Sequence, residues 1–224
     1  MTRLAVFDLD GTLVDSAPDL HAALDRLMAA RRLPAFGRAE VIGMIGDGAK
    51  ILVERALAAR GQPFDQDALD AFLADYTANA AVETRLFPGV AEALEQLRQA
   101  GWRLAVCTNK PEGAARELLG ALGLLGRLAA LGGGDSFSVR KPHPGHLLAT
   151  IAEAGGVPAT SVMVGDHRND VEAARGAGIP CVFVGWGYGP LAMADGAAVA
   201  TWPASLPAEL DAALANDRGP LTRD

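Results

Sequence analysis

The stretch Leu4-Ala5-Val6-Phe7-Asp8-Leu9-Asp10-Gly11-Thr12 decides the fold and puts two carboxylates at the end of the first predicted strand. Residues 4–7 form a continuous apolar run, which is typical of a strand buried on both faces of a parallel sheet. Open α/β sheets bind their ligands at the carboxyl ends of the strands. Asp8 and Asp10 follow this run directly, so one carboxylate can attack a bound group while the other handles protons.

The rest of the chain repeats this pattern. Further apolar runs at residues 104–107, 162–164 and 181–184 each lead into polar or glycine-rich clusters. Helical patterns follow two of them, at residues 112–122 and 170–177. The alternation predicts an α/β fold with a doubly wound, mostly parallel, Rossmann-like sheet.

One region breaks the alternation and contains helical patterns only. These patterns cover residues 17–31, 38–44, 50–59 and 68–77. An all-helical insert after the first strand predicts a small bundle beside the sheet. We therefore expect a catalytic core of residues 1–15 and 83–224, with a helical cap domain of residues 16–82.

The charge of the chain narrows the classes of partner. The 224 residues carry a formal net charge of −7, and half of them are hydrophobic. A nucleic-acid binder needs clustered Lys and Arg to neutralise phosphates, so we expect no nucleic-acid partner. An acidic protein is also a poor candidate for docking on an anionic membrane. A small anionic metabolite remains possible if the protein provides a locally positive pocket.

The two cysteines indicate the redox state of the cellular compartment. Cys107 and Cys181 each lie within an apolar run, where buried free thiols are typical, and neither has the spacing of a redox or zinc pair. The sequence contains no apolar stretch of about 20 residues, the length that a membrane span needs. We expect a cytoplasmic protein, and the sequence carries no signal for the number of subunits.

Three more polar clusters follow apolar runs. Taken singly, each has an ordinary explanation: Thr108-Asn109 can cap a helix, Lys141 can be a surface residue, and Asp166 and Asp170 can cap a helix or serve a function. Together they indicate more, because carboxylates at the ends of two strands can jointly hold Mg²⁺. A lysine and a Thr-Asn pair can then balance the oxygens of a transferring phosphoryl group.

The four motifs in their order resemble the haloacid dehalogenase-like hydrolase superfamily over essentially the whole chain. The motifs are D-x-D-G-T at residues 8–12, Thr108-Asn109, Lys141-Pro142 and G-D-x-x-x-D at residues 165–170. The resemblance implies a Mg²⁺-dependent phosphate-monoester hydrolase that acts through an aspartyl phosphate. It also implies that the helical insert is a cap that closes over the active site.

The same resemblance implies a role for each motif residue. Asp8 is expected to attack phosphorus and to ligate Mg²⁺. Asp10 is expected to protonate the leaving alkoxide, to activate water afterwards and to ligate the metal through its backbone carbonyl. Asp166 is the implied second carboxylate ligand, with Asp170 behind it. The implied phosphoryl-binding residues are Thr108, Asn109 and Lys141.

Within the superfamily, the residues at the motif positions resemble those of the bacterial phosphoglycolate phosphatase family. Two positions depart from its usual pattern, with His167 where Ser or Thr is common and Asp47 where Asn is frequent. The segment Gly46-Asp47-Gly48-Ala49-Lys50 opens a helix of the insert, and backbone N–H groups at a helix start suit a small carboxylate. We therefore expect Gly46, Asp47, Gly48 and Lys50 to contact the substrate.

Other functions remain as alternatives. A dehalogenase of this fold has no need for an acid/base at position 10, so Asp10 favours phosphate esters. A phosphatase acting on a sugar phosphate or on pyrophosphate, or a sugar phosphomutase, would use the same motifs. A non-catalytic binding module is the remaining possibility, and the competent residues at every catalytic position argue against it.

Overall fold

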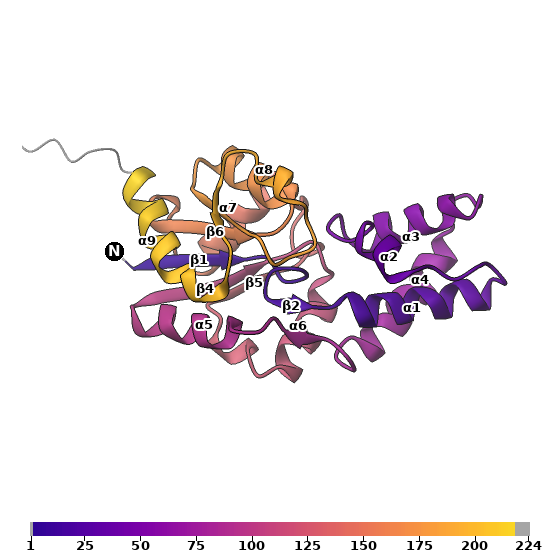
Figure 1. Ribbon diagram of the computed structural model, residues 1–224. Helices are drawn as coiled ribbons and strands as arrows, with labels where there is room; N and C mark the ends of the chain where they lie inside the picture. The colour runs from indigo at the N-terminus through magenta and orange to yellow at the C-terminus, as the bar shows by residue number, and fades with distance from the viewer. Residues whose placement is uncertain (1, 218–224) are drawn as a thin grey trace, which may run out of the picture.

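The strand β1 (Arg3–Phe7) lies near the middle of a six-stranded sheet (Figure 1). The structure is a computed structural model that describes residues 2–217. The strand order is β5-β4-β1-β6-β7-β8, and every pairing is parallel. The remaining strands are β4 (Trp102–Cys107), β5 (Ala130–Gly132), β6 (Ser161–Gly165), β7 (Cys181–Val184) and β8 (Ala198–Ala200). The predicted doubly wound parallel sheet is thus confirmed.

Helices cover both faces of the sheet, and this explains the continuous apolar runs. Successive strand residues point to opposite faces. Ala5 and Phe7 pack with the apolar residues of α5 (Val90–Gln99), α6 (Glu112–Ala121) and α9 (Leu206–Asp217). Leu4 and Val6 pack with those of α7 (Pro144–Glu153) and α8 (Arg168–Ala177) on the other face. Both faces of β1 are therefore buried in apolar clusters.

Two strands of the sheet were missed by the sequence prediction. β5 and β8 have only three residues each, Ala-Leu-Gly and Ala-Val-Ala, and β8 exposes two of its residues. Such short segments carry too few β-branched residues for a periodic signal. They form strands because each pairs with a longer neighbour, β4 or β7, which supplies the hydrogen-bonding partners.

The predicted helical insert forms its own apolar core. Its helices are α1 (Ala17–Ala30), α2 (Arg38–Ile42), α3 (Ala49–Ala59) and α4 (Gln66–Asn79). Leu24, Met28 and Phe72 are among its fully buried side chains. Figure 1 shows the insert beyond the carboxyl ends of the strands, the edge at which Asp8 lies.

The chain enters and leaves the insert at one place. β2 (Val14–Asp15) and β3 (Arg85–Leu86) pair antiparallel, so the two connections run side by side. The buried carboxylate of Asp19, at the start of α1, accepts hydrogen bonds from the backbone N–H groups of Glu83 and Thr84 and from Thr84 Oγ1. These contacts fix the outgoing helix to the returning strand.

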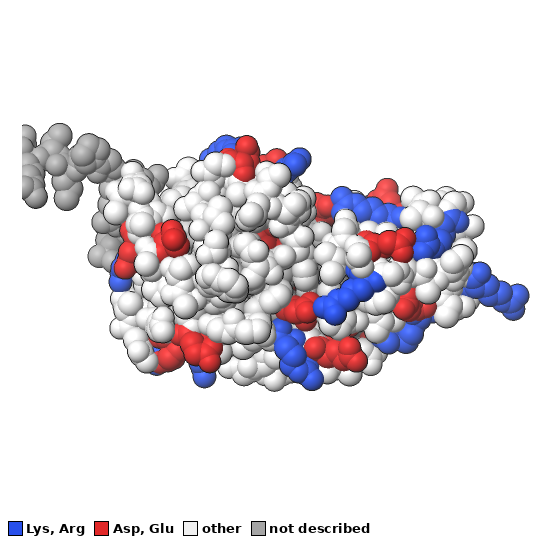
Figure 2. All heavy atoms as spheres, viewed as in Figure 1, with Lys and Arg blue, Asp and Glu red and all other residues white. Residues whose placement is uncertain are grey.

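The charged side chains of the visible face interleave in sign (Figure 2). Some of them form exposed ion pairs, such as Arg26 with Asp75 and Arg38 with Asp15. Across residues 2–217, no helix combines the length and the apolar character needed to cross a membrane.

Candidate active site

Asp8 is held at the end of β1 by the sheet itself. Its backbone N–H donates to the carbonyl of Val164 over 2.9 Å, which continues the pairing of β1 with β6. The chain then turns at Gly11, whose φ of +84° suits glycine. A Cβ at Gly11 would lie 2.3 Å from Asp166 Oδ2, so the turn passes directly against that carboxylate. A glycine is required here for both reasons.

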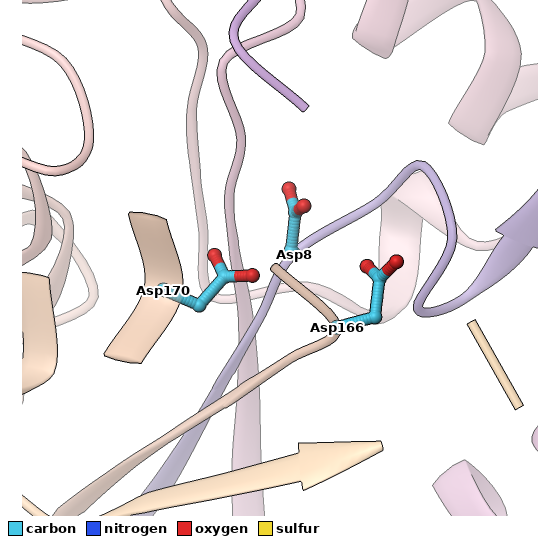
Figure 3. Close-up of side chains that lie close together, drawn as sticks. All are labelled: Asp8, Asp166 and Asp170. Carbon is cyan, nitrogen blue, oxygen red and sulfur yellow. The ribbon is translucent and has the colours of Figure 1, made fainter. Parts of the chain in front are cut away.

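Asp8, Asp166 and Asp170 form a buried carboxylate cluster. They come from the end of β1, from the end of β6 and from the first turn of α8, and Figure 3 shows their carboxylates directed to one region. One oxygen from each lies within 4.8 Å of the others. The parallel sheet therefore gathers residues 8, 166 and 170 at one point, as the sequence predicts for strand ends.

Asp166 is oriented by neutral donors. Thr12 Oγ1 donates to its Oδ1 over 2.9 Å, and the backbone N–H of Tyr188 donates to its Oδ2 over 2.8 Å. Burial, together with the charges of Asp8 and Asp170, raises the pKa of Asp166 to about 7. This carboxyl group therefore needs a cation to be fully ionised at neutral pH.

Lys141 supplies one positive charge to the cluster. Its Nζ lies 2.6 Å from Asp170 Oδ1 and 3.0 Å from Asp8 Oδ1. Burial by itself lowers the pKa of this ammonium group, but Asp170 and Asp8 raise it above its ordinary value. The other Asp170 oxygen accepts from the backbone N–H of His167 over 3.0 Å. Burial and the charge of Asp8 raise the pKa of Asp170 to about 6, although Lys141 opposes this.

The cluster fits a divalent cation. When all three carboxylates are ionised, they and the one ammonium group carry a net charge of −2 in a buried place, which is costly without a counter-ion. Asp8 Oδ1 is buried and forms an ion pair with Lys141, but it accepts no hydrogen bond from the described residues. Hard oxygen ligands of this kind suit Mg²⁺, Ca²⁺ or Mn²⁺.

Thr108 and Asn109 follow β4 and reach the same edge of the sheet. Both are buried, and both line a cavity between the sheet and the insert. Asn109 Nδ2 donates to the backbone carbonyls of Lys141 and Gly46, over 3.0 and 3.1 Å. This amide thus joins the Lys141 loop to the insert.

Lys110 is a residue of the site that the sequence analysis missed. It is buried, and its Nζ donates to both carboxylate oxygens of Asp10 and to Tyr76 Oη. Burial by itself lowers the pKa of Lys110, but Asp10 and Tyr76 raise it above its ordinary value. Its place directly after Thr108-Asn109 at a strand end was the available signal. Tyr76 gave none, because a lone aromatic residue on a helix usually belongs to a core.

The Gly46–Gly48 segment of the insert touches the core. Asn169 Nδ2 donates to the Gly46 carbonyl over 3.2 Å and to Asp47 Oδ1 over 2.7 Å. Arg55 pairs with the same Asp47 carboxylate over 2.5 Å, and both contacts lower the pKa of Asp47 against the opposing effect of its burial. Gly48 has a φ of +86°, and a Cβ there would lie 2.9 Å from the backbone oxygen of Asn109.

Lys50 does not lie where the sequence analysis expects it. It is exposed on α3, and its Nζ lies 5.4 Å from the ring centroid of Phe64, outside the set of residues that line the cavity. On a helix that begins at Ala49, the second residue points away from a cavity that contacts Ala49 and Leu52. Lys50 is thereby corrected from an expected substrate contact to a surface residue.

The cavity is polar on the core side and apolar on the insert side. The core contributes Asp8, Asp10, Thr108, Asn109, Lys110 and Pro111. The insert contributes Leu20, Ile45, Gly46, Gly48, Ala49, Leu52, Phe72 and Tyr76. This arrangement can hold an anionic head against the core under an apolar cover, which excludes water.

The fold, the carboxylate cluster and the order of the motifs define a hydrolase of the haloacid dehalogenase-like family. The chain matches the family model "haloacid dehalogenase-like hydrolase" over residues 2–178, and it belongs to this family.

Several relatives share a more particular name. The chain is 44% identical over 189 residues to a phosphoglycolate phosphatase of Mesorhizobium japonicum, with 83% of each chain covered. It is 42% identical to a phosphoglycolate phosphatase of Agrobacterium fabrum, covering 87% of this chain and 85% of the relative. The crystal structure of a predicted phosphoglycolate phosphatase from Haemophilus somnus superimposes with a TM-score of 0.85 at 32% identity, covering 92% of this chain and 97% of the other.

Proposed function

We propose that the protein is a Mg²⁺-dependent phosphoglycolate phosphatase, which converts 2-phosphoglycolate to glycolate and phosphate through an aspartyl phosphate on Asp8. The observation that carries the proposal is the position of Asp8. Its carboxylate lies 3.0 Å from Lys141 Nζ, beside Asp166, and at the wall of a cavity that Asp10 also lines. The names of the relatives support the choice of substrate.

In this proposal Asp8 attacks phosphorus, and the bond from phosphorus to the glycolate oxygen breaks. Asp10 gives a proton to the departing oxygen and then takes one from the water that hydrolyses the aspartyl phosphate. Lys141, Thr108 and the backbone around Asn109 hold the phosphoryl oxygens. These interactions are strongest when charge builds up on those oxygens, so they lower the barrier.

Mg²⁺ would be held by the carboxylates of Asp8 and Asp166 and by the backbone carbonyl of Asp10, and Asp170 would keep Lys141 in place beside them. When bound, Mg²⁺ supplies the positive charge that lets a carboxylate approach a phosphate dianion. A larger ion with a looser shell would misplace the attacking oxygen, so we expect Ca²⁺ to inhibit.

The insert, residues 16–82, is proposed to act as a cap that selects the substrate. The core groups recognise a phosphoryl group, which many esters share. The cover above them is formed largely by Leu20, Ile45, Leu52 and Phe72, which cannot hydrogen-bond sugar hydroxyls. A buried hydroxyl without a partner is costly, so the cover favours a small two-carbon acid over a hexose phosphate.

A comparison of substrates tests the proposed function. Wild-type protein with Mg²⁺ should show a higher kcat/KM for 2-phosphoglycolate than for glucose 6-phosphate or pyrophosphate. Asp8→Asn should lower kcat at least about 1000-fold, because an amide is no nucleophile, while the thermal unfolding temperature stays at or above that of the wild type. A better kcat/KM for a hexose phosphate or pyrophosphate would overturn the choice of substrate, and an active Asp8→Asn would overturn the nucleophile.

A further inference from the structure

Lys110 is a buried ammonium group whose partners come from both sides of the cavity. Its Nζ lies 2.8 and 2.9 Å from the two carboxylate oxygens of Asp10, which belongs to the core. It also lies 2.5 Å from Oη of Tyr76, which belongs to α4 of the insert. An ammonium group carries three protons, and these contacts account for all three. Another anion can reach Lys110 only by displacing one of its partners.

Lys110 is also the one cation among the described residues that line the cavity. Lys141 lies deeper, engaged by Asp8 and Asp170. A substrate that carries a second anionic group besides its phosphoryl group brings that charge beneath an apolar cover. A charge removed from water needs a partner, and Lys110 is the cation in position to provide it.

We propose that Lys110, assisted by Tyr76, binds the second anionic group of the substrate, and that Asp10 occupies this place until the substrate arrives. The inference rests on the function proposed above, in which that group is the carboxylate of 2-phosphoglycolate and Asp10 transfers protons. The substrate carboxylate replaces the Asp10 carboxylate on Lys110, so the number of ion pairs does not change. Asp10, no longer bonded to the ammonium group, is then free to take up a proton from water and to turn toward the leaving oxygen.

This exchange makes Lys110 a determinant of specificity. An ester without a second charge leaves both carboxylate oxygens of Asp10 bonded to Lys110, so that this carboxylate does not turn toward the leaving oxygen. Such an ester therefore lacks both a binding contact and a free acid/base. Selection by Lys110 acts on the one feature that separates phosphoglycolate from neutral two-carbon esters.

Tyr76 ties the exchange to the position of the insert. Its ring stacks on Phe72, with centroids 5.8 Å apart and planes 5° apart, so its hydroxyl direction is fixed. Ala114 of α6 belongs to the apolar cluster of the insert, so α4 is seated on the helix that follows Lys110. The contact from Tyr76 to Lys110 therefore requires the insert to be closed on the core.

The test compares 2-phosphoglycolate with ethyl phosphate, a two-carbon ester of similar leaving group without the second charge. Lys110→Met should lower kcat/KM for 2-phosphoglycolate about 100-fold or more, mainly through KM, because a buried charge loses its partner. The loss of kcat/KM for ethyl phosphate should be much smaller, because this ester has no carboxylate for Lys110 to bind, so that the preference for 2-phosphoglycolate over ethyl phosphate falls. Tyr76→Phe should lower the phosphoglycolate value about 10-fold, because it loses one hydrogen bond to a charged group.

Arg116→Met is the matched control, since it removes an exposed cation from α6 outside the cavity. Arg116→Met should leave kcat/KM unchanged for both substrates. Product inhibition gives a second readout: Lys110→Met should lose inhibition by glycolate and keep inhibition by inorganic phosphate. Thermal unfolding of each variant separates misfolding from a binding defect, and Tyr76→Phe, which keeps the buried ring, serves if Lys110→Met does not fold.

Equal losses on both esters in Lys110→Met, or unchanged glycolate inhibition, would overturn the role of Lys110. So would a wild-type enzyme that hydrolyses ethyl phosphate as well as 2-phosphoglycolate, although the protein would remain a phosphatase. If the wild type hydrolyses neither ester, the proposed function fails instead. Glycolate binding to the wild type and to Lys110→Met, measured by calorimetry, then decides the anion site by itself.

Discussion

Nζ of Lys141 lies 2.6 Å from Oδ1 of Asp170, and the two side chains are 1% and 0% exposed. A buried ion pair is costly to break from one side, and without the Asp170 carboxylate Lys141 keeps only the longer contact to Asp8, at 3.0 Å. With Mg²⁺ present to offset the repulsion within the carboxylate cluster, Asp170→Asn should therefore lower the free energy of unfolding by about 3 kcal/mol, measured by chemical denaturation.

The matched control for this change is an exposed pair of similar length. Arg175 and Asp195 lie 2.8 Å apart with side chains 57% and 67% exposed. Asp195→Asn should change stability by about 1 kcal/mol or less. If Asp170→Asn and Asp195→Asn lower the free energy of unfolding by equal amounts, burial does not set the strength of the pair between Lys141 and Asp170.

The two carboxylates after β6 should differ in their effect on the metal. One oxygen of Asp170 already pairs with Lys141, whereas Asp166 accepts hydrogen bonds only from neutral donors. The negative charge of Asp166 is therefore available to a metal ion. The Mg²⁺ concentration for half-maximal activity should rise about 10-fold in Asp170→Ala and far more in Asp166→Ala. Activity titrations with Mg²⁺ measure this, and equal shifts would contradict the assignment of Asp166 as a ligand.

Metal-free protein should lose part of its stability as the pH rises from about 4 to about 7. The pKa values of Asp166 and Asp170 are raised from 3.8 to about 7 and about 6. In that window the folded state holds more protons than the unfolded state, so a rise in pH favours unfolding. A divalent cation removes the repulsion, and its stabilising effect should grow over the same window.

Thermal unfolding across this pH range, with a chelator and with Mg²⁺, measures the effect. Other acids in the chain titrate in the same range, so the comparison is with Asp166→Asn, which lacks one of the two groups. The wild type should lose more stability than this variant between pH 4 and 7 when metal is absent. Identical pH dependence would count against a protonated Asp166.

Gly48 should matter for catalysis beyond its backbone conformation. Gly48 and Gly61 both have positive φ, +86° and +70°, but a Cβ meets the backbone oxygen of Asn109 at 2.9 Å only at Gly48, and nothing within 4 Å at Gly61. Gly48→Ala should lower kcat/KM for 2-phosphoglycolate about 10-fold, because the insert can no longer seat against the core. Gly61→Ala should cost about 1 kcal/mol of stability from its left-handed backbone and leave the kinetics unchanged.

Much of this fold could be predicted because its central strands are buried on both faces. β1, β4, β6 and β7 read as continuous apolar runs, and the motif carboxylates follow directly after them. β5 and β8 could not be predicted, because three-residue strands owe their conformation to their neighbours rather than to their own sequence.

The residues of the site also fall into a group that the sequence could predict and a group that it could not. Asp8 and Asp166 follow strands, so the topology of a parallel sheet fixes where they meet. The contact between Tyr76 and Lys110 depends on how the insert packs on α6, which no local pattern encodes. For the same reason the sequence indicated Lys50, near the start of a helix, as a substrate contact and gave no such role to Lys110. The structure distinguishes them by the direction of their side chains, since only Lys110 lines the cavity.

The pairing of β2 with β3 has a consequence for how such a molecule can change. Both crossings into the insert lie in one antiparallel ribbon, and Asp19 bonds one crossing to the other. An insert of different length or sequence should therefore be exchangeable between Asp19 and Glu83 without moving any strand of the main sheet. A chimera that keeps this ribbon and Asp19 retains the reactive groups and exchanges the chamber above them, so the family can diversify by replacing whole modules.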